Sequence, residues 1–333
     1  MKSLLLAALM IATPSIAAAQ TRSEVPIREV DLSDQTRRYV VQIKVGETAI
    51  DAGLDTGSTG IRILPGVLKG SDANETSRKD AYSYGSGAKY DGVIGNAQVT
   101  IAGASGSAPV QLIKKVGCLE AMPRCPVVRT SPEKYGIQGD GLPGEGFKAI
   151  LGINMGRSAA ANPLPLLGAK RWIIELPLPG SGKPGRIILN PTAAESAGYI
   201  TFDIDRRFAQ EEGGMHDAIP ACLVNTAVNQ GFCGATLLDT GAPGIVVING
   251  RGQIWSNDTP AAFVFGDKTK TAVGFKIGYR DFASRLTYTP RPQVSDQRIH
   301  AGLTPYFAYS VLYDADAGTV ALKPRADTKM AIQ

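Results

Sequence analysis

The chain has 333 residues, long enough for two domains, and its 44 % apolar and 20 % charged residues exclude a disordered chain, a collagen and a coiled coil. The formal net charge of +5 is not concentrated in any basic run, so we expect no nucleic-acid partner. Two histidines, His216 and His300, are too few for a multi-histidine metal site.

Residues 1–19 have the pattern of a signal peptide. Lys2 supplies a positive charge, residues 4–12 form an apolar run too short to span a bilayer, and residues 17–19, all Ala, fit a cleavage site. A buried N-terminal helix is the alternative. We expect a mature chain that begins at Gln20, is exported to the periplasm or the extracellular space, and has no membrane span after signal removal. We also expect it to be a monomer.

The mature chain reads as an all-β protein, because short β-rich segments alternate with Gly, Pro and Asn. Strands over residues 39–45 and 48–54 are predicted to form a hairpin, and a second hairpin is predicted around residues 84–87. Further strands are predicted at residues 93–94, 98–101, 186–189, 199–202, 261–265 and 319–322. Helical periodicity is weak, and short helices are expected only near residues 192–197 and 305–309.

Four cysteines fit an oxidising compartment. Six residues separate Cys118 from Cys125, and ten separate Cys222 from Cys233. Two local disulfides are the simplest of the three possible pairings. A metal site is the alternative, but the chain has no Cys-x-x-Cys spacing; free buried thiols are a further alternative.

An internal repeat indicates a duplication. Residues 54–61 and 238–245 share the string Leu-Asp-Thr-Gly-x-x-Gly-Ile, once in each half of the chain. The Pro- and Gly-rich residues 177–185 are the expected seam. We therefore predict an N-terminal lobe over residues 20–178 and a C-terminal lobe over residues 179–333.

Each copy of the repeat places a carboxyl group, Asp55 or Asp239, on a tight turn after an apolar strand. One such turn alone is an ordinary Asx-type turn. Two related turns facing each other would bring two carboxyl groups together, and such a pair shares one proton over a wide pH range. The pair then offers an acid and a base with no histidine, metal, cofactor or covalent nucleophile.

At this point the sequence resembles the pepsin-like (bilobal) aspartic proteases over nearly the whole mature chain. Residues 55–58 and 239–242 match the two catalytic motifs, and Cys222 and Cys233 stand where relatives often carry a small disulfide loop. Further matches are the segments behind the motifs (149–152 and, less cleanly because of His300, 299–302), the flap hairpin (82–87) and the closing strands (309–314 and 318–324). The resemblance implies two β-barrel-like lobes with the active-site cleft between them.

The resemblance also implies roles for individual residues. Asp55 and Asp239 would activate one water for the hydrolysis of a peptide bond in a polypeptide substrate. The remaining active-site residues would brace the two loops (Thr56, Thr240), donate backbone N–H groups to the carboxylates (Gly57, Gly241) and hydrogen-bond the outer oxygen of Asp55 (Ser58).

The flap would consist of Tyr84 and Gly85, closing over the substrate. Several residues depart from the family pattern, among them Ala149, Pro243 and the two that bear most on the site. Arg62 stands where many relatives have a tryptophan that hydrogen-bonds the flap tyrosine. Ala242 lacks the hydroxyl that many relatives offer to the second Asp, so we expect Asp239 to lack a donor and activity to centre on mildly acidic pH.

Three other functions compete with a protease. A non-catalytic protein on the same fold, such as a secreted inhibitor, is the main alternative, although such proteins commonly lose part of a catalytic motif. A serine hydrolase is disfavoured because the chain has no Gly-x-Ser-x-Gly elbow. A dinucleotide-binding domain would use residues 139–144, Gly-x-Gly-x-x-Gly, but this segment contains Pro and opens no helix, so we interpret it as a surface loop.

Overall fold

The computed structural model describes residues 21–208, 214–250, 254–266, 271–290 and 296–332. The signal peptide expected over residues 1–19 lies outside these ranges. Within them, no helix is both long and apolar enough to cross a membrane.

Strands make up most of the regular structure. The first half of the chain forms β1 (Ser23–Asp31), β2 (Arg37–Val45), β3 (Thr48–Asp55), β4 (Thr59–Ile63), β5 (Ala73–Ser83), β6 (Ala88–Ile101), β7 (Ala104–Cys118), β8 (Ala149–Ile153), β9 (Arg171–Glu175) and β10 (Gly185–Leu189). The second half forms β11 (Ile200–Asp203), β12 (Ile219–Asn225), β13 (Gln230–Leu238), β14 (Ile245–Ile248), β15 (Pro260–Phe265), β16 (Ala272–Lys276), β17 (Leu286–Thr289), β18 (Arg298–Gly302), β19 (Tyr309–Asp314), β20 (Thr319–Pro324) and β21 (Ala331–Ile332).

Helices are few and short among the described residues. Two are α-helical, α1 (Pro163–Leu166) and α2 (Thr304–Ala308), and the others are 3₁₀ turns: η1 (Pro126–Arg129), η2 (Arg206–Phe208), η3 (Gly214–Asp217) and η5 (Arg280–Phe282). The predicted helix at residues 305–309 is confirmed as α2. The predicted helix at residues 192–197 is wrong: one i→i+4 bond forms, from the Ser196 N–H to the Thr192 carbonyl, and Gly198 with φ +79° then turns the chain.

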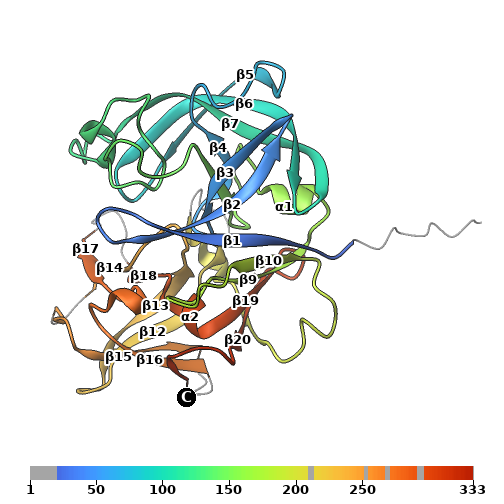
Figure 1. Ribbon diagram of the computed structural model, residues 1–333. Coiled ribbons are helices and arrows are strands. Elements are labelled where there is room, and N and C mark those ends of the chain that lie inside the picture. The colour runs from blue at the N-terminus through green and yellow to red at the C-terminus, as the bar shows by residue number, and fades with distance from the viewer. Residues whose placement is uncertain (1–20, 209–213, 251–253, 267–270, 291–295, 333) are drawn as a thin grey trace, which may run out of the picture.

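The described strands form two sheets. One runs in the order β11-β20-β19-β9-β10-β1-β2-β3-β8-β4-β7-β6-β5, and the other in the order β17-β14-β18-β13-β12-β15-β16-β21. Figure 1 shows the consequence: strands β2–β7 fill one half of the molecule, β12–β18 fill the other, and β1, β10, β9 and β19 lie between them. The expected division at residue 178 falls in the connection from β9 to β10, inside this central part, and stays a prediction.

The duplication appears as the same three-strand arrangement in each half. In the first half β8 pairs parallel with β3 and antiparallel with β4; in the second, β18 pairs parallel with β13 and antiparallel with β14. Gly152 lies beside Asp55, and Gly302 lies beside Leu238, the residue before Asp239. A side chain at Gly302 would lie 2.4 Å from the Gly244 carbonyl oxygen, so this strand passes close behind the second motif.

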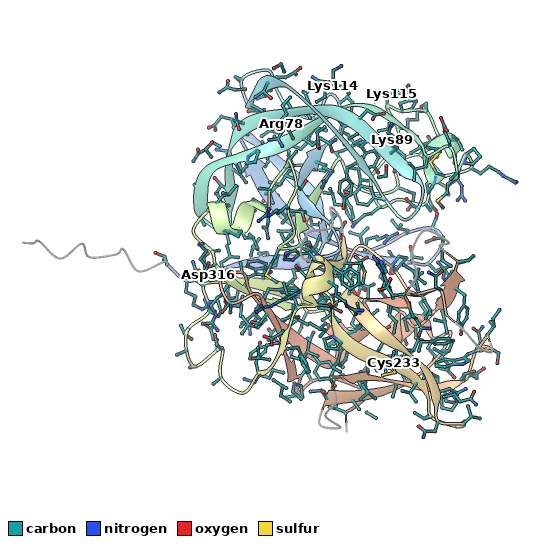
Figure 2. The ribbon with its side chains drawn as sticks, turned by 180° about the vertical axis from the view of Figure 1, so that it is seen from behind. Arg78, Lys89, Lys114, Lys115, Cys233 and Asp316 are labelled. Atoms are coloured by element: carbon teal, nitrogen blue, oxygen red, sulfur yellow. A yellow bond between two sulfur atoms is a disulfide. The ribbon has the colours of Figure 1, made fainter. Side chains whose placement is uncertain are left out.

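One buried apolar cluster extends through both halves. Trp172 of β9 stacks on Tyr313 of β19, with ring centroids 5.7 Å apart, where strands from the two halves meet. Both expected disulfides are present, Cys118–Cys125 and Cys222–Cys233, the second joining register partners of β12 and β13. Figure 2 shows Cys233 in the second half of the molecule, and Arg78, Lys89, Lys114 and Lys115 on the first.

The strand predictions hold closely. The first hairpin is β2–β3, and the segments at 93–94 and 98–101 belong to one long strand, β6, which pairs with β5 around the predicted turn at 84–87. The four remaining predicted strands fall on β10, β11, β15 and β20, with β11 starting one residue later than predicted.

Candidate active site

The two Asp-Thr-Gly turns face each other, each carboxyl group against the glycine of the other turn. A methyl group added at Gly57 would lie 2.4 Å from Asp239 Cγ, and one added at Gly241 would lie 2.6 Å from Asp55 Oδ1. Contacts this short leave no room for a Cβ atom at either position. The glycines therefore allow the two carboxyl groups to approach a common space, as the sequence motif predicts.

Thr56 and Thr240 link the two turns reciprocally. The Thr240 hydroxyl accepts the Thr56 N–H at 3.0 Å, and the Thr56 hydroxyl accepts the Thr240 N–H at 2.9 Å. Each hydroxyl also donates across the interface, to the carbonyl of Leu238 at 2.7 Å or Leu54 at 3.1 Å. Because both threonines are buried, these four bonds form in a dry environment and fix the two turns relative to each other.

A tyrosine pair supports this link from behind, and the sequence analysis missed it. The hydroxyl of Tyr306, on α2, donates to Thr56 Oγ1 at 3.0 Å and lies 2.6 Å from the hydroxyl of Tyr313 on β19. Burial raises the pKa of both phenols, so they remain neutral donors. The sequence signals near this pair were the predicted helix at residues 305–309 and the closing strand at residues 309–314, and neither indicated this contact.

Each carboxyl group accepts the backbone N–H of the glycine in its own turn, and the partners of the outer oxygens differ. Asp55 Oδ1 accepts the Gly57 N–H at 2.8 Å, and Asp55 Oδ2 accepts the Ser58 hydroxyl at 2.7 Å. Asp239 Oδ1 accepts the Gly241 N–H at 2.9 Å.

The outer oxygen of Asp239 has a different partner. His300 Nδ1 lies 3.2 Å from Asp239 Oδ2. Ala242 offers Asp239 no hydroxyl, as expected, but His300 occupies the place of a partner to this oxygen, which the sequence did not lead us to expect. The expected activity at mildly acidic pH stays a prediction. One signal for this contact was present in the sequence, the departure of His300 from the family pattern.

Burial dominates the electrostatics of the pair. Asp55 is 3 % exposed and Asp239 is 9 % exposed. Burial and then the neighbouring Asp239 raise the pKa of Asp55 to about 7, although the bonds from Ser58 and Gly57 oppose the rise. A site with one raised carboxyl pKa holds a proton near neutral pH, so the pair can present an acid and a base together.

A cation lies beside the second turn. Arg38, on β2, donates from Nη1 to the Gly241 carbonyl at 2.6 Å. Burial lowers the pKa of Arg38, and the carboxylates of Asp34, Asp239 and Asp55 counteract part of that effect. Arginine stays protonated in proteins, so Arg38 adds a positive charge at the edge of the site. Nothing in the sequence pattern of β2 identified it.

Tyr84 lies in the turn of the flap hairpin, between β5 and β6. Its N–H donates to the Ala88 carbonyl at 2.9 Å, and its carbonyl accepts the Gly87 N–H at 2.9 Å, which closes a tight turn with Gly85 exposed at the tip. The Tyr84 hydroxyl is buried, and the Ser58 side chain lies within its reach. Burial raises the pKa of this phenol, so Tyr84 stays neutral.

Arg62 positions the flap through Tyr82. The Arg62 side chain is 0 % exposed, its Nη1 donates to the Thr59 carbonyl at 2.6 Å, and its guanidinium carbon lies 3.5 Å from the centre of the Tyr82 ring. Tyr82 in turn packs edge-on against Tyr84, with ring centroids 4.9 Å apart. A buried cation–π contact of this kind is worth about 2 kcal/mol. Arg62, which stands where many relatives have a tryptophan, thus contacts the flap hairpin through Tyr82.

Comparisons with known proteins identify the fold. No family model matches the sequence, and no curated protein matches it. Among solved structures, the chain is similar to the aspartic proteinase from Irpex lacteus, with a TM-score of 0.61 and 14 % sequence identity over 93 % of this chain and 99 % of that chain. The fold is that of a pepsin-like aspartic proteinase. At this identity the likeness shows the fold alone.

On this pepsin-like fold, the residues predicted from the motifs lie in two groups. The two aspartates lie together with their support, namely Thr56, Gly57, Ser58, Thr240 and Gly241. The flap residues Tyr84 and Gly85 lie on the neighbouring hairpin. Their catalytic roles stay predictions. Within the described ranges, no group of three or more His, Cys, Asp or Glu could hold a metal ion.

Proposed function

We propose that the chain is an aspartic-type endopeptidase, which hydrolyses peptide bonds in polypeptides with a water activated by Asp55 and Asp239. One observation carries the proposal: each carboxyl group packs on the glycine of the opposite turn, and the threonine link holds both. A single Asx turn needs no such partner. The pepsin-like fold supports the same reading.

The chemistry requires only the shared proton and one water. The ionised carboxylate removes a proton from the water while the protonated carboxyl group donates its proton to the scissile carbonyl oxygen, and the water oxygen bonds to the carbonyl carbon. The tetrahedral intermediate then breaks its C–N bond as the protonated carboxyl group gives its proton to the leaving amine and the other carboxylate takes a proton from a hydroxyl group of the intermediate. The pair returns to one proton, so no co-reactant is consumed. The apparent pKa values belong to the pair as a whole, so we assign neither the acid nor the base to one of the two aspartates.

The surroundings fit a polypeptide substrate. Both carboxyl groups are nearly buried, and we propose that the turn of the hairpin that carries Tyr84 moves to admit a substrate. We propose that the protein acts as a monomer, in the periplasm or outside the cell. Two disulfides support an oxidising compartment.

The test is a peptide-library digestion from pH 3 to pH 8, with products identified by mass spectrometry and with pepstatin as inhibitor. We expect internal cleavages that pepstatin blocks. Asp55→Asn and Asp239→Asn, each checked for folding by circular dichroism, should lower kcat by at least about a thousandfold, because a lone carboxyl group cannot act as acid and base in one cycle.

Two outcomes would reject the proposal. Cleavage that survives in either folded variant would remove the pair from the mechanism. Pepstatin binding without cleavage of any peptide at any pH would favour the alternative, a non-catalytic binding protein on this fold.

A further inference from the structure

The two halves of the site use different side chains for the same bond. Three residues after the first Asp stands Ser58, whose hydroxyl donates to Asp55; three residues after the second stands Ala242, which has no hydroxyl. On the strand behind each turn the difference is reversed. The first turn has Ile150 there, which cannot form a side-chain hydrogen bond, and the second has His300, which can.

The strand register shows that Ile150 and His300 are equivalent positions. Ile150 pairs with Gly53, two residues before the first Asp, and with Arg62, seven residues after it. His300 pairs with Leu237, two residues before the second Asp, and with Val246, seven residues after it. The second half has therefore exchanged a hydroxyl on the turn for an imidazole on the strand behind it.

We propose that His300 is a positioning residue that holds the outer oxygen of Asp239 in place of the missing hydroxyl, and that it adds a third ionisable group to the carboxyl pair. The proposal rests on the proposed protease function only for its effect on rate. The contact itself is a property of the folded chain.

The direction of the bond follows from the acceptors. Asp239 Oδ1 already accepts the Gly241 N–H, and an ionised carboxylate can only accept, so we assign the ring proton that points to Oδ2 to Nδ1 of His300. A hydroxyl group donates its hydrogen bond as an uncharged group, whereas an imidazole can donate either uncharged or as an imidazolium. An imidazolium beside Asp239 favours the ionised form of that carboxyl group, which leaves the shared proton on Asp55.

The charges of the three groups can balance one another. A pair that holds one proton carries a charge of −1, so an imidazolium at His300 brings these three groups to zero, and Arg38 beside the second turn opposes that added positive charge. The raised pKa of Asp55 agrees with a proton held on that side of the pair. Ser58 donates to Asp55 with or without that proton, because a hydroxyl does not titrate in this range.

Among the described residues, the ionisable groups on the elements near β18 are few, and Asp239 is the acidic one that contacts His300. From β2, Arg38 faces Asp239 and opposes a second positive charge there; Arg285, next to β17, is exposed. On β18 itself, Arg298 bonds Asp296 at 3.2 Å and lies over the ring of Phe208. From α2, the neutral Tyr306 bonds Thr56. Asp239 is thus the acidic group in contact with His300, whose side chain is 23 % exposed and open to exchange of protons with water.

The first experiment reads the contact without any activity measurement. The chain has two histidines, so NMR of the histidine-labelled protein gives two titrations. In Asp239→Asn we expect the His300 titration to move to lower pH, because the neighbouring negative charge is gone. His216, which pairs with Asp217 at 2.8 Å, serves as the internal control and should not move. An unchanged His300 titration overturns the proposal.

The second experiment copies one half of the site into the other. His300→Ile should lower kcat about tenfold to a hundredfold, the effect of one lost bond to a charged group. Ala242→Ser added to His300→Ile reproduces the arrangement of the first turn and should restore most of the rate. His300→Asn keeps a donor that cannot titrate, so it should retain activity but lose one ionisation from the plot of kcat against pH.

The outcomes separate this inference from the proposed function. If the NMR contact is present and no variant or wild-type protein cleaves peptides, the protease proposal fails and the His300–Asp239 contact stands. If the wild type cleaves peptides and His300→Asn has an unchanged pH profile, the third ionisation is refuted. If His300→Ile is as active as the wild type, the positioning role is refuted.

Discussion

Replacing Asp55 by Asn should stabilise the protein at neutral pH and not at acidic pH. Burial and Asp239 raise the pKa of Asp55 from 3.8 to about 7. The folded chain then binds this proton more tightly than the unfolded chain, so the contribution of Asp55 to the free energy of unfolding is full below about pH 4 and is lost as the pH rises through 7. At about 1.4 kcal/mol for each pKa unit, the loss reaches at most about 4 kcal/mol.

Urea unfolding followed by fluorescence at pH 4, 5, 6, 7 and 8 measures this loss. Asparagine keeps the shape of the side chain and its bond from the Gly57 N–H, while removing the ionisation. The variant should match the wild type near pH 4 and exceed it by a few kcal/mol at pH 8. Stability curves that run parallel over this range would show that the burial of Asp55 imposes no ionisation cost.

A control of opposite sign is available at Asp72. Its carboxylate accepts the Thr48 hydroxyl at 2.6 Å and the N–H groups of Glu47 and Lys69 at 2.8 Å each, and these bonds lower its pKa. Such a group stabilises the fold above the ordinary pKa of Asp, and the contribution is lost as the pH falls. Asp72→Asn should therefore lower the free energy of unfolding at neutral pH and leave it unchanged in acid.

Three further predictions concern single contacts. Gly57→Ala should lower kcat by about a hundredfold in steady-state assays, because the new methyl group displaces the facing carboxyl group; wild-type rates would contradict the packing. Arg62→Lys should lower kcat/KM and lower the free energy of unfolding in urea by about 1–2 kcal/mol, since an ammonium group cannot stack flat on Tyr82. An unchanged kcat/KM and an unchanged stability would argue against this contact. Cys222→Ser with Cys233→Ser should lower the free energy of unfolding by roughly 2–3 kcal/mol, because the unfolded chain gains the entropy of an open loop. A clearly smaller loss in urea unfolding would contradict this explanation.

Local features were predictable from the sequence because their causes are local. An Asp followed by Thr and Gly specifies a turn whose N–H groups reach the carboxylate, and this holds at both Asp55 and Asp239. Hairpins follow from alternation and turn residues in the same way. The false helix at residues 192–197 shows the limit: its first turn forms, but no apolar face follows to pack a longer helix, and Gly198 ends it.

Beyond the contacts that the repeat and the family resemblance imply, contacts between distant residues could not be predicted, since no periodicity indicates them. His300 and Asp239 are 61 positions apart, and Tyr306 and Thr56 are 250 apart. Each contact depends on how strands from separate parts of the chain pair. Arg38 reaches Gly241 for the same reason, and its strand looks like any other half-buried strand in sequence.

The order of strands in the larger sheet has a consequence for biogenesis. β19 and β20, near the end of the chain, insert between β9 and β11, which are not neighbours without them. A chain still emerging from its ribosome, or one truncated before Tyr309, leaves the backbone edges of β9 and β11 unpaired. Such edges are templates for intermolecular strand addition. We therefore expect C-terminal truncations to aggregate rather than yield a smaller folded protein, and we expect the carboxyl pair to be assembled only after synthesis is complete.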